Sequence, residues 1–121
     1  MNNPSLPADD LPPPNLDLKD SLMRWNLEQS LAKHFFQACT QRQQALLSNC
    51  GWYITTGKAP TLVIECPDEV TNWRVLKSLV KLGGVLKKLA KNAKIRVEPP
   101  PGMGTAFEMR VDELFVYKYS P

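Results

Sequence analysis

The sequence predicts an α+β fold in which two amphipathic helices cover one face of a four- or five-stranded, mostly antiparallel sheet. Two observations support this prediction. Two long segments carry apolar residues at three- and four-residue steps, and short runs rich in β-branched and aromatic residues are separated by Gly- and Pro-containing turns. The resulting order, αββαββ, is that of a ferredoxin-like split βαβ sandwich whose first strand is moved to the end. A chain of 121 residues, 43% hydrophobic, has room for one packed core.

Residues 1–20 are expected to form a disordered leader, and residues 21–121 a single domain. The leader holds five of the eleven prolines and four aspartates, and it follows neither a helical nor a strand period. It is therefore either a solvated tail or a peptide arm that orders on a larger partner.

A first helix is predicted to begin at Asp20 or Ser21, either of which can cap it, and to end near Ser48. Gly51 then suits the left-handed backbone conformation that commonly follows a helix. The apolar stripe of this helix consists of Leu27, Leu31, Phe35, Ala38 and Ala45, widened by Phe36, Cys39 and Leu46.

Four strands are predicted from period-two patterns and turn residues. Their ranges are 52–56, 61–66, 93–98 and 105–111. The four residues 57–60 join the first two strands into a hairpin, and the Pro- and Gly-rich run 99–104 separates the last two. Residues 114–119 either extend the fourth strand or pair back as a fifth.

A second helix is predicted to begin after its cap, Asp68, and it carries the most informative pattern of the chain. From Arg74 to Lys94 there are seven basic residues and no acidic residue. At 100° per residue the leucines share one sector, which would face the core, whereas the basic residues take the opposite sector. The opposite sector holds Arg74, Lys77, Lys81, Lys88 and Lys91, with Lys87 and Lys94 at its border.

This basic face indicates a binding surface, because like charges at helical spacing repel one another by a few tenths of a kcal/mol per pair and do not help the fold. Trp73 falls on the same side and would anchor a partner, although it could equally pack under the 99–104 loop. The alternative is that the charges only keep the protein soluble. The predicted partner-binding residues are Trp73, Arg74, Lys77, Lys81, Lys88 and Lys91.

An acidic protein surface is the preferred partner, because the net charge of +3 is modest for a nucleic-acid binder. RNA is the second choice, since basic side chains would contact phosphates and strand aromatics could stack on bases. The aromatic candidates are Trp52, Tyr53, Phe107, Phe115, Tyr117 and Tyr119. Residues 105–111 nevertheless lack the glycine and paired aromatics of the usual RNA-recognition strand. A membrane surface fits least, because the leucines are needed for the core.

No catalytic, metal or cofactor site is predicted, so we expect a protein that is not an enzyme. His34 is the only histidine and has no Cys or carboxylate at ligand spacing. Three cysteines without a C-x-x-C pair (Cys39, Cys50, Cys66) are expected to be free thiols in a reducing compartment. Residues 101–105 follow a strand but open no helix, unlike a phosphate-binding loop. Neither a signal peptide nor a membrane span is evident, which favours a cytoplasmic or stromal location.

The stretches 46–54 and 62–67, together with the proline-rich leader and Pro99-Pro-Pro-Gly, resemble small soluble proteins of oxygenic phototrophs. In size and layout the chain is similar to subunit V of the photosynthetic NAD(P)H dehydrogenase-like complex, over roughly residues 25–120. The resemblance implies a non-catalytic peripheral subunit near the docking site of ferredoxin, an acidic iron–sulfur protein. It transfers no functional residue.

Overall fold

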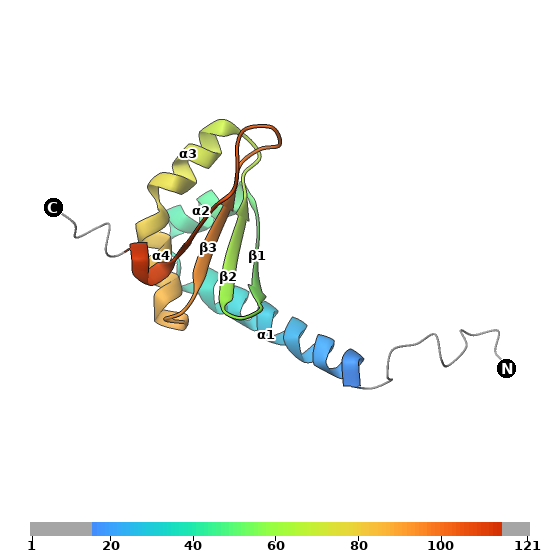
Figure 1. Ribbon diagram of the computed structural model, residues 1–121. Helices are drawn as coiled ribbons and strands as arrows, with labels where there is room; N and C mark the ends of the chain where they lie inside the picture. The colour runs from blue at the N-terminus through green and yellow to red at the C-terminus, as the bar shows by residue number, and fades with distance from the viewer. Residues whose placement is uncertain (1–15, 115–121) are drawn as a thin grey trace.

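The computed structural model describes residues 16–114, which form helices and one four-stranded sheet (Figure 1). The elements are α1 (Leu16–Ala38), α2 (Gln41–Ser48), β1 (Gly51–Thr56), β2 (Pro60–Glu65), α3 (Glu69–Lys77), α4 (Leu79–Leu89), β3 (Lys94–Glu98) and β4 (Phe107–Arg110). Residues 111–114 add a short helical turn. The α+β class is confirmed, and so is the predicted hairpin of the first two strands.

The first predicted helix ends at Ser48 as expected, but its start and its continuity are wrong. It begins at Leu16, so residues 16–20 are helical rather than part of a disordered leader, and neither Asp20 nor Ser21 is its cap. It also breaks after Ala38, because Thr40 starts a new helix with a capping box. The backbone N–H of Gln43 donates to the Thr40 hydroxyl oxygen at 3.2 Å, and the backbone N–H of Thr40 donates to the Gln43 side-chain oxygen at 2.8 Å.

The second predicted helix is divided as well. Its cap is as predicted, since Asp68 accepts a hydrogen bond of 2.7 Å from the backbone N–H of Thr71. The helix is interrupted at Ser78, whose φ of −97° and ψ of 2° lie outside the α-helical region. The chain therefore presents two consecutive helices, α3 and α4, where the sequence predicts one.

The strand order is β1-β2-β3-β4, with antiparallel, parallel and antiparallel pairings in turn. A permuted ferredoxin-like sheet would place β4 between β2 and β3, and this part of the prediction is wrong. The two parallel strands are direct neighbours, joined by α3 and α4 as an unsplit βαβ unit. The physical reason lies in β3, where Ile95 and Val97 are fully buried, whereas β4 carries exposed charged residues suited to an edge.

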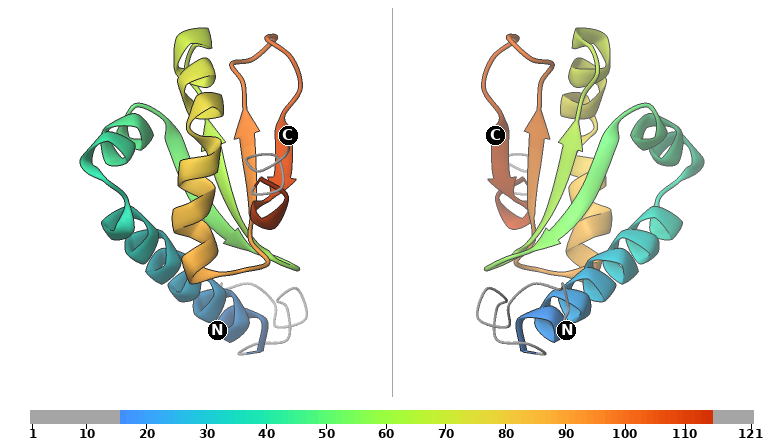
Figure 2. Two further views of the ribbon diagram at one scale, coloured as in Figure 1. Left: turned by 90° about the vertical axis from the view of Figure 1, so that its left-hand side faces the viewer. Right: turned by 90° about the vertical axis from the view of Figure 1, so that its right-hand side faces the viewer.

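The pairing register builds two apolar rows on the side of the sheet that faces the helices. The rows are Ile54–Leu62–Ile95–Met109 and Trp52–Ile64–Val97–Phe107. Figure 2 shows α3 and α4 lying across this face, with α1 beside α4. Leu82 and Leu86 of α4 and Phe35 of α1 join the strand residues in one core.

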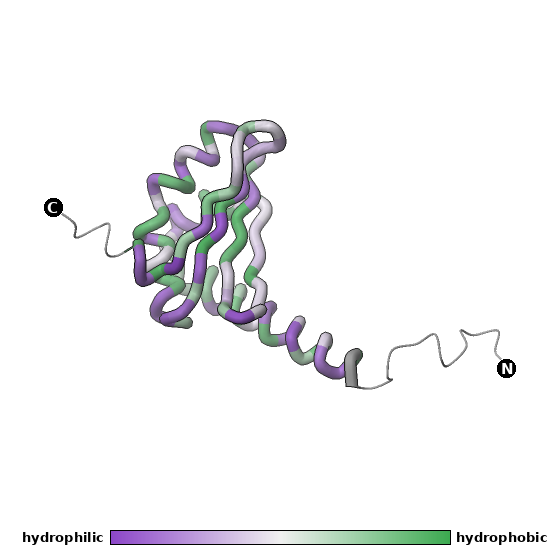
Figure 3. The backbone as a smooth tube through the Cα atoms, in the orientation of Figure 1, coloured by the Kyte–Doolittle hydropathy of each residue, from purple (hydrophilic) through white to green (hydrophobic). Residues whose placement is uncertain are grey.

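Helix α1 is fastened to the sheet only through its C-terminal half. The ring of Phe36 stacks on Trp52 at 5.7 Å, and Phe35 meets Trp52 edge-on at 5.9 Å. The Glu28 carboxylate accepts hydrogen bonds from the Thr56 amide at 2.7 Å and the Thr56 hydroxyl at 3.1 Å. The preceding turns project beyond the sheet (Figure 1) and keep hydrophobic positions along their length (Figure 3). Their exposed apolar residues are Leu18, Leu22, Met23, Trp25 and Leu27.

The turn at residues 111–114 closes the core on the side of α4. Gly83 allows this approach, because a Cβ atom at that position would lie 2.8 Å from the Leu114 side chain. Leu114 is thus buried in a helical turn rather than in a strand, and the rest of the predicted fifth strand, 115–119, lies outside the described residues. Within residues 16–114, no helix combines the length and apolarity that crossing a membrane requires.

Candidate partner-binding surface

The predicted binding residues occupy the outer side of α3 and α4, and all of them are exposed. Trp73 and Arg74 lie on α3, where the Lys77 ammonium stands 5.9 Å from the centre of the Trp73 ring as a cation–π contact. Lys81 belongs to the first turn of α4. Lys88 and Lys91 lie at and beyond the other end of α4. With a rise of 1.5 Å per residue, Lys88 lies about 10 Å along α4 from Lys81, so the basic residues extend along α4 as a row rather than forming one compact cluster.

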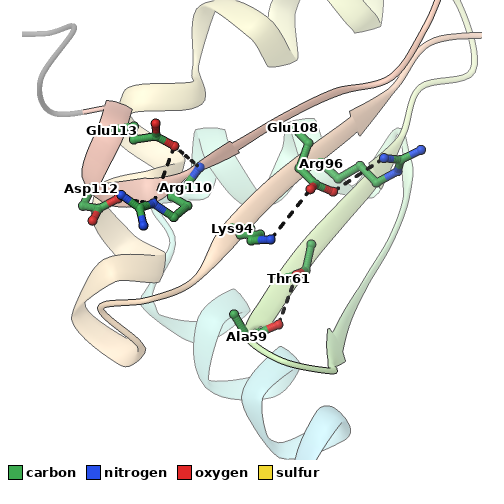
Figure 4. A network of polar contacts seen from close by, with 8 residues as sticks. All are labelled: Ala59, Thr61, Lys94, Arg96, Glu108, Arg110, Asp112 and Glu113. Atoms are coloured by element: carbon green, nitrogen blue, oxygen red, sulfur yellow. Dashed lines mark hydrogen bonds and ion pairs between the residues drawn. The ribbon is translucent and has the colours of Figure 1, made fainter.

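Four of these helix cations differ from the sheet cations, because no carboxylate of the described residues pairs with them. Among residues 16–114, no carboxylate lies within 4.0 Å of the ammonium groups of Lys77, Lys81, Lys88 or Lys91. The sheet cations, by contrast, are paired. Arg96 lies 3.0 Å from Glu98. Figure 4 shows the other pairs: Arg96 with Glu108 at 3.5 Å, Lys94 with Glu108 at 4.0 Å, and Arg110 with Asp112 and Glu113. The charges of these four lysines are therefore open to an outside anion.

An apolar hollow of about 550 Å³ flanks this surface on one side, between α3 and the β3–β4 loop. Its apolar walls are Val70, Trp73, Leu76, Pro100 and Met103. The loop bends here through two glycines in the left-handed region, Gly102 at φ 79° and Gly104 at φ 122°. Trp73 borders the hollow but is 61% exposed, so the loop adjoins the indole without covering it. The hollow can accept an apolar side chain next to the cations.

A second depression lies on the opposite side of α3, against α2, and sequence reasoning missed it. Two adjoining hollows of about 590 and 550 Å³ share Arg42, Leu46 and Ser78. We call them together the α2–α3 groove. Its remaining lining residues are Thr40, Gln41, Gln43, Ala45, Asn49, Arg74, Lys77 and Lys81. The sequence signal that could have revealed it is the capping box of Thr40 and Gln43, which breaks the first helix and turns Arg42 toward α3.

The thiols do not resemble nucleophiles. The β1–β2 register brings Cys50 opposite Cys66, and the two thiols interact. The sequence does not indicate this pairing, because the two residues do not form a C-x-x-C motif. Burial raises the pKa of Cys39 to about 11. Burial and the neighbouring Cys66 thiol raise the pKa of Cys50 to about 12, and burial also raises the pKa of Cys66. All three thiols are protonated at neutral pH, where only a thiolate would attack an electrophile.

The other groups with chemical potential are engaged in local contacts. His34 is exposed on α1, and its Nδ1 atom lies 2.8 Å from the Ser30 carbonyl oxygen. The carboxylates of Glu98, Glu108, Asp112 and Glu113 are spread over the ion pairs of the sheet and its following turn. Within residues 16–114, no group of three or more His, Cys, Asp or Glu side chains could hold a metal ion.

The open face of the sheet offers little for base stacking. Trp52 and Phe107 belong to the row that faces the helices, which leaves Tyr53 as the aromatic residue of the open face within residues 16–114. The other three aromatic candidates, Phe115, Tyr117 and Tyr119, lie outside the described residues.

Comparison of the chain with protein-family models, with curated proteins and with solved structures finds no match. The fold and the charged surface are therefore the basis for a functional conclusion.

Proposed function

We propose that the protein is a non-catalytic accessory subunit that docks in a larger protein complex, with its α3–α4 surface facing an acidic partner. The observation that carries the proposal is the contrast between the two sets of cations. The sheet cations are ion-paired, whereas Lys77, Lys81, Lys88 and Lys91 have no carboxylate within 4.0 Å among residues 16–114. Unpaired surface charges of one sign speed the approach of an oppositely charged protein and fix its orientation.

Trp73 supplies what such a surface needs besides charge. Large aromatic residues that become buried on binding often contribute most of the affinity at protein interfaces. Here an exposed indole stands next to an apolar hollow and under a lysine ammonium. In our proposal, a partner side chain fills the hollow against Trp73 while acidic groups meet the lysines. The partner would be reached on the cytoplasmic or stromal side of a membrane complex, and the resemblance to photosynthetic accessory subunits suggests an electron-transfer complex.

RNA binding is the second candidate, because the same cations could contact phosphates. A protein partner is favoured by the open face of the sheet, where arginine and lysine are paired with glutamate and Tyr53 is the aromatic residue within the described range. Single-stranded RNA recognition usually relies on several stacked aromatics.

Charge reversal tests the proposal. We expect Lys77→Glu/Lys81→Glu/Lys88→Glu to lose the partner while keeping the far-UV circular dichroism of the wild type. The matched control reverses three exposed lysines elsewhere, Lys19, Lys33 and Lys58, and changes the net charge by the same amount. Both variants and the wild type serve as baits for affinity capture from the native host, and the captured proteins are identified by mass spectrometry.

The lysate is divided, and one half is treated with nuclease before capture. A protein set that survives nuclease, is kept by the control and is lost by the α3–α4 variant supports the proposal. Retention of the same set by the α3–α4 variant contradicts it. Loss of all binding after nuclease treatment would point to RNA instead.

A further inference from the structure

The α2–α3 groove gathers positive charge from α2 and from the two consecutive helices α3 and α4, which lie further along the chain. Arg42 comes from α2, Arg74 and Lys77 from α3, and Lys81 from α4. The other polar lining residues include the amide side chains of Gln41 and Asn49 and the Ser78 hydroxyl, and no acidic residue lines either hollow. The Ser78 hydroxyl makes no capping bond to α4. A carboxylate entering the groove would thus meet four cations and several hydrogen-bond donors.

Arg42 occupies a position that the fold does not favour. It lies in the first turn of α2, where the positive end of the helix dipole prefers an acidic side chain, and this turn contains none. None of the ion pairs among residues 16–114 involves Arg42. Its charge is unfavourable for α2 and well placed for an anion in the groove.

The acidic side chains of the leader do not reach the groove. Asp9 and Asp10 of the leader precede Leu16 by six or seven residues, so they reach at most about 25 Å from the start of α1. Helix α1 has 23 residues, and at 1.5 Å per residue it separates its start from α2 by about 34 Å. Residues 115–121 contain no acidic residue.

A nucleic acid also fits the groove poorly, because its apolar lining is Ala45 and Leu46 and offers no ring on which a base could stack. Arginine guanidinium groups, in contrast, bind carboxylates with two parallel hydrogen bonds. We propose that the α2–α3 groove binds an extended acidic peptide segment of the partner, with Arg42 and Arg74 contacting its carboxylates. This inference rests on the proposed function and adds a site and a residue, Arg42, to it.

The test measures fluorescence anisotropy of a labelled peptide of alternating Glu and Ser residues with the full-length protein at low ionic strength. We expect Arg42→Glu to weaken binding by about tenfold, with the effect shrinking as salt is added. Arg42→Lys keeps the charge but loses the paired hydrogen bonds to the carboxylate, so its affinity should lie between those of the wild type and Arg42→Glu. Lys58→Glu is the matched control, since it makes the same charge change at an exposed lysine in the β1–β2 loop. A peptide with Gln in place of Glu should not bind.

Stability provides a second readout that separates binding from folding. Because Arg42→Glu puts a carboxylate at the positive end of α2, it should leave the thermal unfolding midpoint unchanged or raise it. Weaker peptide binding together with a maintained midpoint supports the groove.

The remaining outcomes distinguish the two proposals. Lys88→Glu/Lys91→Glu changes the basic surface and leaves the lining of the groove intact. If Arg42→Glu and Lys58→Glu have equal effects while Lys88→Glu/Lys91→Glu abolishes binding, the groove is overturned and the basic surface stands. If the wild type and Lys77→Glu/Lys81→Glu/Lys88→Glu bind the peptide equally, the proposed function itself fails. If single-stranded oligonucleotides bind more tightly than the peptide and this binding depends on Arg42, the ligand of the groove is a nucleic acid and the acidic peptide is overturned. If the protein forms a dimer that Arg42→Glu abolishes, the ligand is the leader of a second copy.

Discussion

Replacing Phe35 by alanine should be among the most destabilising substitutions in this chain. Phe35 is fully buried, and its ring meets Trp52 edge-on at 5.9 Å, so the change removes core packing and an aromatic contact together. A fully buried Phe→Ala change costs about 4 kcal/mol of unfolding free energy. Phe36 is a matched comparison one residue away. It is half-buried and stacked on the same indole, so Phe36→Ala should cost only about 2 kcal/mol.

Urea unfolding followed by far-UV circular dichroism measures both changes. With a slope of about 2 kcal/mol per molar urea, Phe35→Ala should lower the midpoint by about 2 M and Phe36→Ala by about 1 M. Small domains have about 5–15 kcal/mol in total, so Phe35→Ala removes a large share of the stability. Equal effects of the two substitutions, or a cost below about 1.5 kcal/mol for Phe35→Ala, would refute the packing of α1 on the sheet through Trp52.

Three further predictions concern caps and thiols. Thr40→Ala removes the capping box of α2 and should cost about 1 kcal/mol in the same urea assay, whereas an unchanged midpoint would show that the box contributes nothing. The hydrogen bonds from Thr71 hold the pKa of Asp68 below its ordinary value of 3.8, so its stabilisation is present above pH 3.8 and is lost as the pH falls through the depressed pKa. Acid unfolding curves of the wild type and Asp68→Asn should therefore converge at low pH, and a constant difference would contradict this. Because burial raises the pKa of Cys39 to about 11 and that of Cys50 to about 12, iodoacetamide at pH 8 should label the native thiols at least about tenfold more slowly than urea-unfolded protein. Equal rates, followed by mass spectrometry, would contradict their protonated state.

The sequence was sufficient for those parts of the fold that depend on local pattern. The alternation of side chains along residues 52–56 and 61–66 predicts the first hairpin. Asp68 predicts the start of α3, because a capping side chain bonds to a backbone amide only a few residues further on. The breaks at Thr40 and Ser78 are harder to predict, since the apolar stripe continues across both positions. The position of β4 at the edge of the sheet depends on which whole strands are buried. A local sequence pattern does not contain that information.

The candidate surface divides in the same way. Helical periodicity places Arg74, Lys77 and Lys81 on the outside, and the structure has them there. Arg42 is more than thirty residues away in sequence, and only the packing of α2 beside α3 brings it to the same groove. The pairing state of the cations also requires the structure, because it depends on which carboxylates the sheet register brings opposite Lys94 and Arg96.

Helix α1 is continuous, but its two halves should differ in local stability. From Glu28 onward it is tied to Thr56 and Trp52, so its amide hydrogens should exchange only when the core opens. Residues 18–27 have exposed side chains, and an isolated helix of this length is marginal in water. These turns should unwind repeatedly while the rest stays folded, with an opening free energy near zero and a boundary at Glu28. A partner that covers Leu22 and Trp25 would then slow hydrogen exchange in this half alone.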